Sequence, residues 1–442
     1  MQLPVKPKVL MLGWEYPPYL NGGLGVATAG LAAALAPLTE LTLVLPRSEV
    51  ARLPAGGRIL SLHGQALPER RQRHTRRETE LLREVRVEYV PVVLQGYEQV
   101  GRRFAPITRE HWLRVEHLVP EDLITRPAQP FFIDQLYGDD VVSRVIDYSE
   151  LVLRLAEDLD FDLIHAHDWM TFLAGLHLKA RSGKPLVLHV HSLEYDRGGP
   201  ASRGWIFELE QHALHQADLV MPVSRYTADI LRRVYGVASD RLYPVRNGIE
   251  PMDRYRVARP FAEPLVAFLG RITPQKGPRY FFDAALRVLR QGTPAQFVVA
   301  GRGEEIDALM RQATAAQVRD RVHFPGFLDR DRVRDLLAMA DVFVLPSVSE
   351  PFGLVALEAA QMGVPCLLST QSGVAEVLHG ALQVDYADTE AMARLIARLI
   401  RAPHLRAQVI AAQDRALARI SWPATAQKVL TGYAQIKGMR GG

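Results

Sequence analysis

Strand-like and helix-like segments alternate along almost the whole chain. Short apolar runs rich in Val, Leu and Ile are separated by helix-like stretches such as residues 24–37 and 205–217. The strand-like runs of the first half are residues 8–14, 40–46, 162–167, 185–191, 218–223 and 241–245. Continuous apolar strands between helices are typical of a parallel sheet covered on both faces. The sequence therefore predicts an α/β protein built from βαβ units.

The alternation occurs in two series. Polar residues, Gly and Pro interrupt it at residues 246–264, and a second series follows with strand-like runs from 264–270 onwards. The chain has 442 residues, more than one hydrophobic core usually serves. We therefore expect two Rossmann-like domains, residues 1–250 and 251–420, which bind ligands at the carboxyl ends of their strands. The stretch from Arg47 to Tyr137 is less regular and reads as an insertion.

Composition excludes several classes of protein. A single cysteine, Cys366, rules out an internal disulfide and fits a reducing compartment. The first residues lack the pattern of a signal peptide, and no apolar run approaches about 18 residues, so we expect a cytoplasmic protein without membrane spans. The net charge of +4 is too small to indicate nucleic acid. The basic stretch Glu69–Arg86 is either a solvated helix face or a weak contact with an anionic membrane or acceptor.

A glycine-rich segment, Asn21–Gly30, joins the first strand to the first helix. Gly22 and Gly23 allow a ligand to approach the backbone, and the helix amides favour negative charge. The alternative is a turn chosen only for close packing. A dinucleotide site is disfavoured because no acid follows about 20 residues later. The segment Gly301–Glu305 is a second, equally weak glycine motif.

Two neighbouring strands end in His-x-His. His165 and His167 precede Asp168, and His189 and His191 end the next strand. Alternation places each pair on one face of the sheet. Four imidazoles near a carboxylate could bind zinc. The preferred interpretation is that some of them are core residues and one or two hydrogen-bond a polar substrate, and we expect no metal.

Two cations follow the first strand of the second half. Arg271 and Lys276 lie in the loop after this strand, where they suit the two phosphates of a diphosphate. The alternative is that both are ordinary surface charges on a loop.

Two glutamates surround a glycine that opens a helix. Glu350 comes just before the helix, Gly353 opens it, and Glu358 lies about one turn inside. A glycine at this point allows a ligand to approach the free helix amides, where the dipole favours an anion. Glu350 would then face sugar hydroxyls, and Glu358 the two hydroxyls of a ribose. Taken in isolation, the pattern favours a structural interpretation, in which Glu350 complements the helix dipole and Glu358 is an ordinary helix residue.

Together these motifs resemble the retaining glycosyltransferases of the GT-B fold, specifically family 4 and the neighbouring glycogen and starch synthases. The matching pieces are GWEYPPYLNGGLG, HAHDW, PVSRYTADIL, RNGIE, LGRITPQKG, VVAGRGEE, PGFLDRD and SEPFGLVALEAAQMGVP, in the family's order. The resemblance implies an α/β fold with two Rossmann-like domains that face across a deep cleft. It also implies that residues 421–442 form a last helix that crosses back to the first domain.

The resemblance implies a role for each matching residue. Arg271 and Lys276 would bind the donor's distal phosphate, while the amides of Leu354 and Val355 would meet phosphate beside Gly353. Glu350 would hold the sugar, and Glu358 the ribose. The remaining assignments are that Gly326, Phe327 and Leu328 lie along the base, that His167 contacts the sugar beside Asp168, and that Gly22 and Gly23 close over the phosphates.

We therefore expect a retaining, metal-independent transferase without a cofactor that moves a hexose, favoured as glucose, from an ADP- or UDP-linked donor to a glycan. The leaving phosphate would assist attack on the same face. The alternatives are transfer to a lipid-linked or surface polysaccharide acceptor, a nucleotide-sugar epimerase or hydrolase on the same frame, and a non-catalytic binding protein. Where glycogen synthases carry Lys-x-Gly-Gly, this chain has Leu20 and Asn21 before its glycines. Donor base, acceptor and oligomeric state are left open.

Overall fold

The computed structural model describes residues 6–54, 56–66, 131–133, 136–138 and 140–439. The chain divides into two compact units. The first comprises Met1–Val223, Thr227–Gly248 and Trp422–Gly442, and the second comprises Ser224–Tyr226 and Ile249–Ser421. The basic stretch Glu69–Arg86 lies outside the described residues. Within those residues, no helix is long and apolar enough to cross a membrane.

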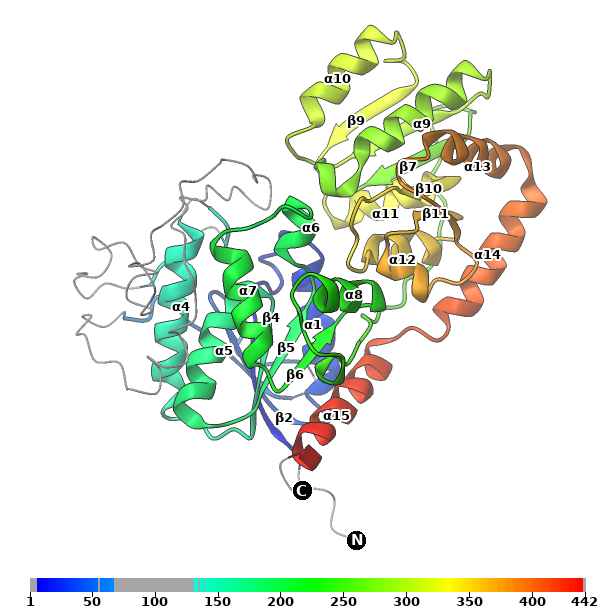
Figure 1. Ribbon diagram of the computed structural model, residues 1–442. Helices are drawn as coiled ribbons and strands as arrows, with labels where there is room; N and C mark the ends of the chain where they lie inside the picture. Colours follow the sequence, from blue (N-terminus) through cyan, green and yellow to red (C-terminus); the bar gives the residue numbers. More distant parts are fainter. Residues whose placement is uncertain (1–5, 55, 67–130, 134–135, 139, 440–442) are drawn as a thin grey trace. The chain divides into compact units, whose positions relative to one another are not determined.

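The first unit is built on a parallel sheet of six strands in the order β3-β2-β1-β4-β5-β6 (Figure 1). Its strands are β1 (Lys8–Leu12), β2 (Glu40–Leu45), β3 (Arg58–Ser61), β4 (Leu163–His167), β5 (Leu186–Val190) and β6 (Leu219–Pro222). Its helices are α1 (Gly23–Leu35), α4 (Val141–Ala156), α5 (Trp169–Ser182), α6 (Glu194–Gly198), α7 (Trp205–Gln216), α8 (Arg225–Arg233, whose first two residues belong to the second unit), the 3-10 turn η3 (Ser239–Arg241) and α15 (Trp422–Met439).

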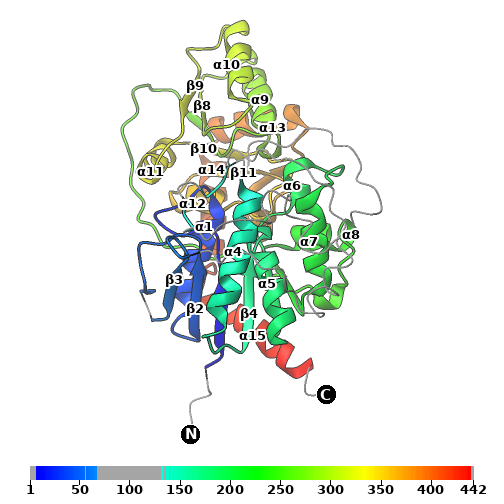
Figure 2. The same cartoon turned by 90° about the vertical axis from the view of Figure 1, so that its left-hand side faces the viewer.

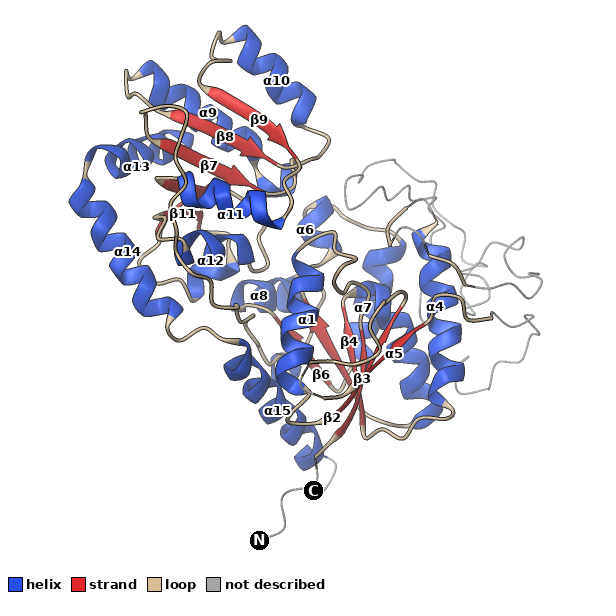
Figure 3. Cartoon of the chain, turned by 180° about the vertical axis from the view of Figure 1, so that it is seen from behind, coloured by secondary structure: helices blue, strands red, loops and turns tan. Residues whose placement is uncertain are grey.

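The second unit has its own parallel sheet in the order β12-β11-β10-β7-β8-β9 (Figure 3). Its strands are β7 (Leu265–Leu269), β8 (Gln296–Ala300), β9 (Val322–Gly326), β10 (Val342–Leu345), β11 (Cys366–Ser369) and β12 (Leu382–Val384). Its helices are α9 (Pro278–Arg290), α10 (Ile306–Ala315), α11 (Arg330–Met339), α12 (Leu354–Gln361), α13 (Thr389–Arg401) and α14 (Pro403–Leu417), with 3-10 turns η4 (Pro274–Lys276) and η5 (Gly373–Glu376).

The central strands of both sheets are buried on their two faces, which explains their continuous apolar sequences. In the first unit, α1 and α15 pack on one face, and α4, α5 and α7 cover the other (Figure 2). In the second, α9, α10 and α13 contribute to one core with the strands. The predicted α/β fold with two Rossmann-like units is confirmed.

One predicted strand is wrong, and two strands, β3 and β12, were missed. Residues 241–245 follow β6 through a single bridge, between Val220 and Leu242, and do not form a strand. Pro244 lacks the N–H that would continue the ladder. The irregular stretch from Arg47 to Tyr137 contains β3, which pairs with β2 at the edge of the first sheet.

The last helix packs on the first helix at a glycine. A Cβ on Gly30 of α1 would lie 2.2 Å from Cε2 of Trp422, the first residue of α15. Trp422 is buried at 3% exposure and belongs to the same core as β1 and α1. The absence of a side chain at Gly30 therefore allows α15 to complete the first unit.

We predict that Gly30→Val destabilises the first unit by about 1–3 kcal/mol, because the added methyl groups force Trp422 out of its packing. Urea unfolding followed by tryptophan fluorescence measures the change. Val26→Ala, at a 39% exposed position of the same helix, is the control and should change stability by less than about 0.5 kcal/mol. Equal stability of Gly30→Val and wild type would contradict this packing.

Candidate active site

The loop after β7 places both predicted cations at the carboxyl end of the second sheet. Nη2 of Arg271 donates to Oε1 of Gln275 at 2.7 Å, and Nε2 of Gln275 donates to the carbonyl of Ser349 at 3.1 Å. The carbonyl of Gln275 in turn accepts from the amide of Val348 at 2.9 Å. These bonds tie the Arg271 loop to the segment that carries Glu350.

Gly277 permits this close approach. Its φ is +67°, and a Cβ there would lie 2.1 Å from the carbonyl oxygen of Pro346. A larger residue would push the loop after β7 away from the loop after β10. The lysine next to it, Lys276, is therefore held beside residues 346–350.

Lys276 and Glu350 form an ion pair. Nζ of Lys276 lies 2.6 Å from Oε2 of Glu350, and the hydroxyl of Ser347 donates to the same oxygen at 3.0 Å. The two side chains are only 16% and 6% exposed. Because water has little access to this pair, its electrostatic interaction is weakly screened. A third charge nearby would therefore affect the interaction between Lys276 and Glu350.

Helix α12 begins directly after this pair. Gly353 is its N-cap with a φ of +101°, and no side-chain cap is present there within the described part of the chain. A Cβ on Gly353 would lie 3.1 Å from Cγ of Glu350. Leu354 and Val355 form the first turn and are half-buried. Their amides belong to the end of the helix that carries partial positive charge, so the arrangement suits an anion.

Glu358 lies on α12, one turn after its start. It is half-buried, and burial raises the pKa of its carboxyl above the ordinary value, while Arg330 acts in the opposite direction. A carboxylate in such surroundings gains from hydrogen-bond donors such as hydroxyls. Glu350 therefore lies before the first turn of α12, and Glu358 lies after it.

The loops after β8 and β9 meet at the same end of this sheet. The amide of Gly301 donates to the carbonyl of Gly326 at 2.8 Å. After Gly326 come Phe327, which is 60% exposed, and the half-buried Leu328. The guanidinium of Arg302 lies 5.2 Å from the centre of the Phe327 ring. An exposed aromatic ring at the ligand end of a sheet provides a face for a planar group.

In the first unit, the glycine loop surrounds a buried carboxylate that sequence reasoning did not single out. Glu15 is fully buried, and its Oε2 accepts the amides of Asn21 at 3.0 Å and Gly25 at 3.3 Å. A Cβ at Gly25 would lie 2.9 Å from Cβ of the buried Glu15, so a larger residue there would disturb this carboxylate. Gly22, the N-cap of α1, has open space around its Cα.

The Glu15 carboxylate affects the electrostatics at the start of α1. Its Oε1 accepts from the hydroxyl of Tyr137, and burial raises the pKa of Glu15 while these hydrogen bonds lower it. Part of the positive end of α1 therefore already faces an internal acid. Gly23 is the first residue of this helix.

The four histidines form a stacked ladder. Nδ1 of His167 lies 2.9 Å from Nε2 of His191, and Nδ1 of His189 lies 3.2 Å from Nε2 of His165. The other nitrogen of His165 lies 2.6 Å from the hydroxyl of Tyr433 in α15. Burial lowers the pKa of all four imidazoles, that of His189 to about 3, so the ladder is neutral.

The ladder also bears on the zinc alternative. Nitrogens of His165, His167 and His189 lie within 4.8 Å of one another. Two of the ring pairs are stacked at 15° and 21° and the third is tilted by 36°, and Nδ1 of His189 and Nε2 of His165 already lie at hydrogen-bond distance from each other. The geometry therefore favours hydrogen bonds between rings over a shared ion. Nε2 of His167 is buried and has no hydrogen-bond partner among the described residues.

Asp168 follows β4 in a strained conformation. Its φ is +57°, which is uncommon for a residue other than glycine. Its Oδ1 accepts the amides of His191 at 2.6 Å and Ser192 at 3.2 Å. Asp168 thereby fixes the loop after β5. Burial raises the pKa of Asp168 to about 7, although these hydrogen bonds and Arg197 oppose the rise.

The sequence-predicted residues thus form one group in each unit. Arg271, Lys276, Glu350 and the start of α12 lie together in the second unit, with Glu358 one turn further on. His167 and Asp168 belong to the first, as do Gly22 and Gly23. Sequence reasoning missed Glu15, Gln275 and Ser347. Glu15 lies inside the quoted GWEYPP motif and Gln275 inside LGRITPQKG, so attention to every polar residue of these motifs would have found two of the three.

Comparison with known proteins identifies the family. The model of glycosyl transferases group 1 matches residues 253–415, and that of Glycosyltransferase Family 4 matches residues 104–252. An alpha-maltose-1-phosphate synthase of Mycolicibacterium smegmatis is 32% identical over 313 residues, which are 62% of this chain and 79% of that protein. The chain belongs to glycosyltransferase family 4. It is a transferase that uses nucleotide-sugar donors with retention of configuration, and the predicted family is confirmed.

Two further glycosyltransferases cover nearly the whole chain. A glycogen synthase of Mycobacterium tuberculosis is 26% identical over 449 residues, with 97% of this chain and 94% of that protein covered. The catalytic domain of starch synthase IV from Arabidopsis thaliana, bound to ADP and acarbose, superimposes with a TM-score of 0.64 at 16% identity. The superposition covers 98% of this chain and 99% of that chain. This likeness confirms the GT-B fold.

The raised pKa of Asp168 predicts a pH dependence of stability. A folded pKa of about 7, above the ordinary 3.8, means that the folded state keeps a proton that the unfolded state has lost in this window. Stability that is present below pH 4 should therefore be lost as pH rises towards 7, at about 1.4 kcal/mol per pH unit.

Asp168→Asn removes this titration. Urea unfolding of the variant and wild type at pH 4.5, 5.5 and 6.5 measures the difference between their unfolding free energies. We expect the difference to move in favour of the variant as pH rises. A difference that stays constant across this range would show that Asp168 does not titrate there.

Proposed function

We propose that this glycosyltransferase moves a glucosyl residue from an ADP- or UDP-linked donor to a glycan, without a metal ion. The observation that carries the proposal is the Lys276–Glu350 pair directly before the glycine-capped start of α12. It combines a cation, a carboxylate and a positive helix end where the loops after β7 and β10 meet. A glycosyl diphosphate presents the complementary groups, an anionic diphosphate attached to a polyhydroxylated ring.

In this proposal the diphosphate lies at the start of α12. The amides of Leu354 and Val355 bind phosphate oxygens, and Arg271 and Lys276 neutralise the charge that develops on the leaving diphosphate. Stabilising developing charge with preorganised groups is an effective form of catalysis. Gln275 holds Arg271 towards the Glu350 segment, so the two cations reach the same group.

The two glutamates distinguish the ends of the donor. Glu350 accepts hydrogen bonds from sugar hydroxyls, and Glu358 accepts them from the ribose. The base lies along Gly326, Phe327 and Leu328, where Phe327 offers an exposed ring face. The first unit contributes Nε2 of His167 to the sugar and Gly23 to the phosphates. Asp168 acts on His191, so we assign it to positioning.

Retention requires no protein nucleophile in this account. The leaving phosphate oxygen takes the proton of the acceptor hydroxyl while the new bond forms on the same face of the sugar. The two cations supply the charge stabilisation that a divalent metal gives in other transferases. The glucosyl donor and the glucan acceptor are supported by the relatives' activities, which include alpha-maltose-1-phosphate, glycogen and starch synthesis.

Transfer assays test the proposal directly. We expect glucose transfer from ADP-glucose or UDP-glucose to soluble glucans, with α configuration in the product by NMR, and little loss of rate in excess EDTA. Matched reactions contain maltooligosaccharides, a phosphorylated sugar or a lipid-linked glycan as the acceptor. A separate arm without acceptor measures donor hydrolysis.

Three outcomes would contradict the proposal. Isomerised donor would point to an epimerase, and hydrolysis that no acceptor redirects would point to a hydrolase. Exclusive transfer to the lipid-linked acceptor would replace the soluble glycan. Loss of transfer in EDTA that magnesium or manganese restores would show that a metal takes part.

A further inference from the structure

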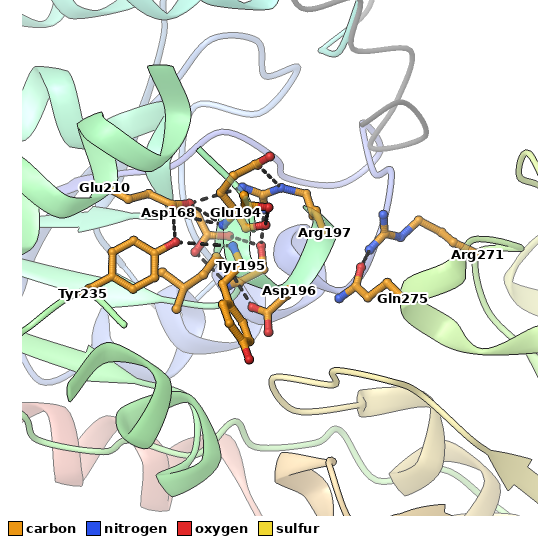
Figure 4. A network of polar contacts seen from close by, with 12 residues as sticks. Asp168, Glu194, Tyr195, Asp196, Arg197, Glu210, Tyr235, Arg271 and Gln275 are labelled. Carbon is orange, nitrogen blue, oxygen red and sulfur yellow. Dashed lines mark hydrogen bonds and ion pairs between the residues drawn. The ribbon is translucent and has the colours of Figure 1, made fainter. Parts of the chain in front are cut away.

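A buried polar network surrounds Arg197 in the first unit (Figure 4). Its members come from three elements: Ser192, Glu194 and Arg197 from the segment after β5, Glu210 from α7, and Tyr235 after α8. We call these five residues the Arg197 network. None of them belongs to the roles proposed above.

Arg197 is the centre of this network. Its side chain is 3% exposed. Nε donates to Oε2 of Glu194 at 2.9 Å, Nη2 to Oε1 of Glu210 at 3.2 Å, and Nη1 to the hydroxyl of Ser192 at 3.0 Å. The planar fork of a guanidinium can hold three acceptors in fixed directions, which an ammonium group cannot do in the same way.

Glu210 fixes the far side of Arg197. It is fully buried, and both its oxygens accept the amide of Glu194 at 3.0 Å. The hydroxyl of Tyr235 donates to its Oε2 at 2.6 Å and accepts the amide of Tyr195 at 3.3 Å. The start of α6 is therefore attached to α7 and to the residues after α8 through one carboxylate.

The other side of Arg197 leads to His167, the histidine that we propose contacts the sugar. The Ser192 hydroxyl, which accepts from Arg197, lies 3.3 Å from Oδ2 of Asp168. Asp168 accepts the amide of His191, and the imidazole of His191 bonds to Nδ1 of His167. A continuous series of hydrogen bonds thus leads from Arg197 to His167.

Charge explains why a cation is needed at this point. Glu194, Glu210 and Asp168 gather around the guanidinium of Arg197 (Figure 4). Burial raises the pKa of Glu210 to about 8 and that of Asp168 to about 7, and Arg197 lowers both. Asp168 accepts three donors as a carboxylate, and protonation would remove part of this capacity.

We propose that Arg197 is a positioning residue, which orients His167 through Ser192, Asp168 and His191 and so sets the rate of sugar transfer. The inference rests on the proposed role of His167. It adds a residue that contacts neither the donor nor its phosphates. The nucleotide is bound by residues of the second unit in our proposal, so loss of Arg197 affects turnover more than donor binding.

Arg197→Met and Ser192→Ala test the inference. The first removes the guanidinium, and the second removes only the hydroxyl between Arg197 and Asp168. We expect kcat to fall roughly tenfold to a hundredfold in Arg197→Met and by a smaller factor in Ser192→Ala, because small misplacements of a reacting group are costly. KM for the donor should change less than about threefold. Arg197→Lys should restore part of kcat.

The dependence of kcat on pH distinguishes a positioning role from a general loss of stability, which would not shift this dependence. Asp168 is faced by Arg197, by Ser192 and by the loop of His191, while the ladder histidines are neutral. Loss of the guanidinium raises the pKa of Asp168 further, so the acidic limb of kcat against pH should move to higher pH in Arg197→Met.

Lys179→Met is the matched control. Lys179 pairs with Asp218 at 2.8 Å in the same unit, with exposures of 22% and 21%, but at the amino-terminal ends of β5 and β6. It should lower the melting temperature and leave kcat within about twofold. Folding is monitored for every variant by circular dichroism. If Arg197→Met fails to fold, Ser192→Ala and Arg197→Lys carry the test.

The inference fails if folded Arg197→Met and Ser192→Ala keep wild-type kcat and pH profiles, or if Arg197→Met loses kcat only as far as Lys179→Met does. Failure of the proposed function looks different. In that case His167→Ala would keep its activity, or wild type would transfer no sugar to any acceptor.

Discussion

The ion pair between Lys276 and Glu350 is the constraint on which the second unit's site depends. Gly277 brings the two loops close enough for it, Gln275 attaches Arg271 to the same segment, and Gly353 opens α12 directly behind it. The pair is nearly buried, so each charge is stabilised chiefly by the other. In the proposed function, an anionic diphosphate would compete with Glu350 for Lys276. Donor binding would then redistribute an existing interaction and couple the phosphate end of the donor to the carboxylate proposed to hold its sugar.

In the first unit, too, buried charged side chains hold the loops after the strands in place. Loops after parallel strands have few backbone partners of their own, and buried carboxylates supply them here. Glu15 accepts amides of the loop before α1, Asp168 accepts those of the loop after β5, and Glu210 accepts that at the start of α6. Each acid is desolvated, and each gains hydrogen bonds that offset this cost. Rigid loops then present His167 and Gly23 in fixed positions.

Local sequence patterns predicted the fold and most of the candidate residues in the second unit. Contacts between residues distant in the sequence could not be predicted. Strand, loop and helix follow one another within 20 residues around Glu350, so spacing alone places Gly353 and Glu358. The partners of Glu15 and His165 include Tyr137 and Tyr433, which lie 122 and 268 residues away. The local sequence pattern cannot predict contacts between residues that are so far apart in the chain. The strand predicted at residues 241–245 is wrong for a local reason. The prediction gave more weight to the apolar character of this segment than to Pro244, which has no backbone N–H to donate.

The central claim is that Glu350 holds the sugar and Glu358 the ribose of one donor. Calorimetric titration of Glu350→Gln and Glu358→Gln with the free nucleoside diphosphate, beside turnover with the donor, tests it most directly. Glu350→Gln should lose turnover while its affinity for the diphosphate stays the same or rises, because Lys276 loses a competing carboxylate. Glu358→Gln should bind the diphosphate roughly ten- to a hundredfold more weakly, the worth of a charge-assisted hydrogen bond. The account is contradicted if Glu350→Gln loses diphosphate affinity while Glu358→Gln keeps it, or if neither variant changes.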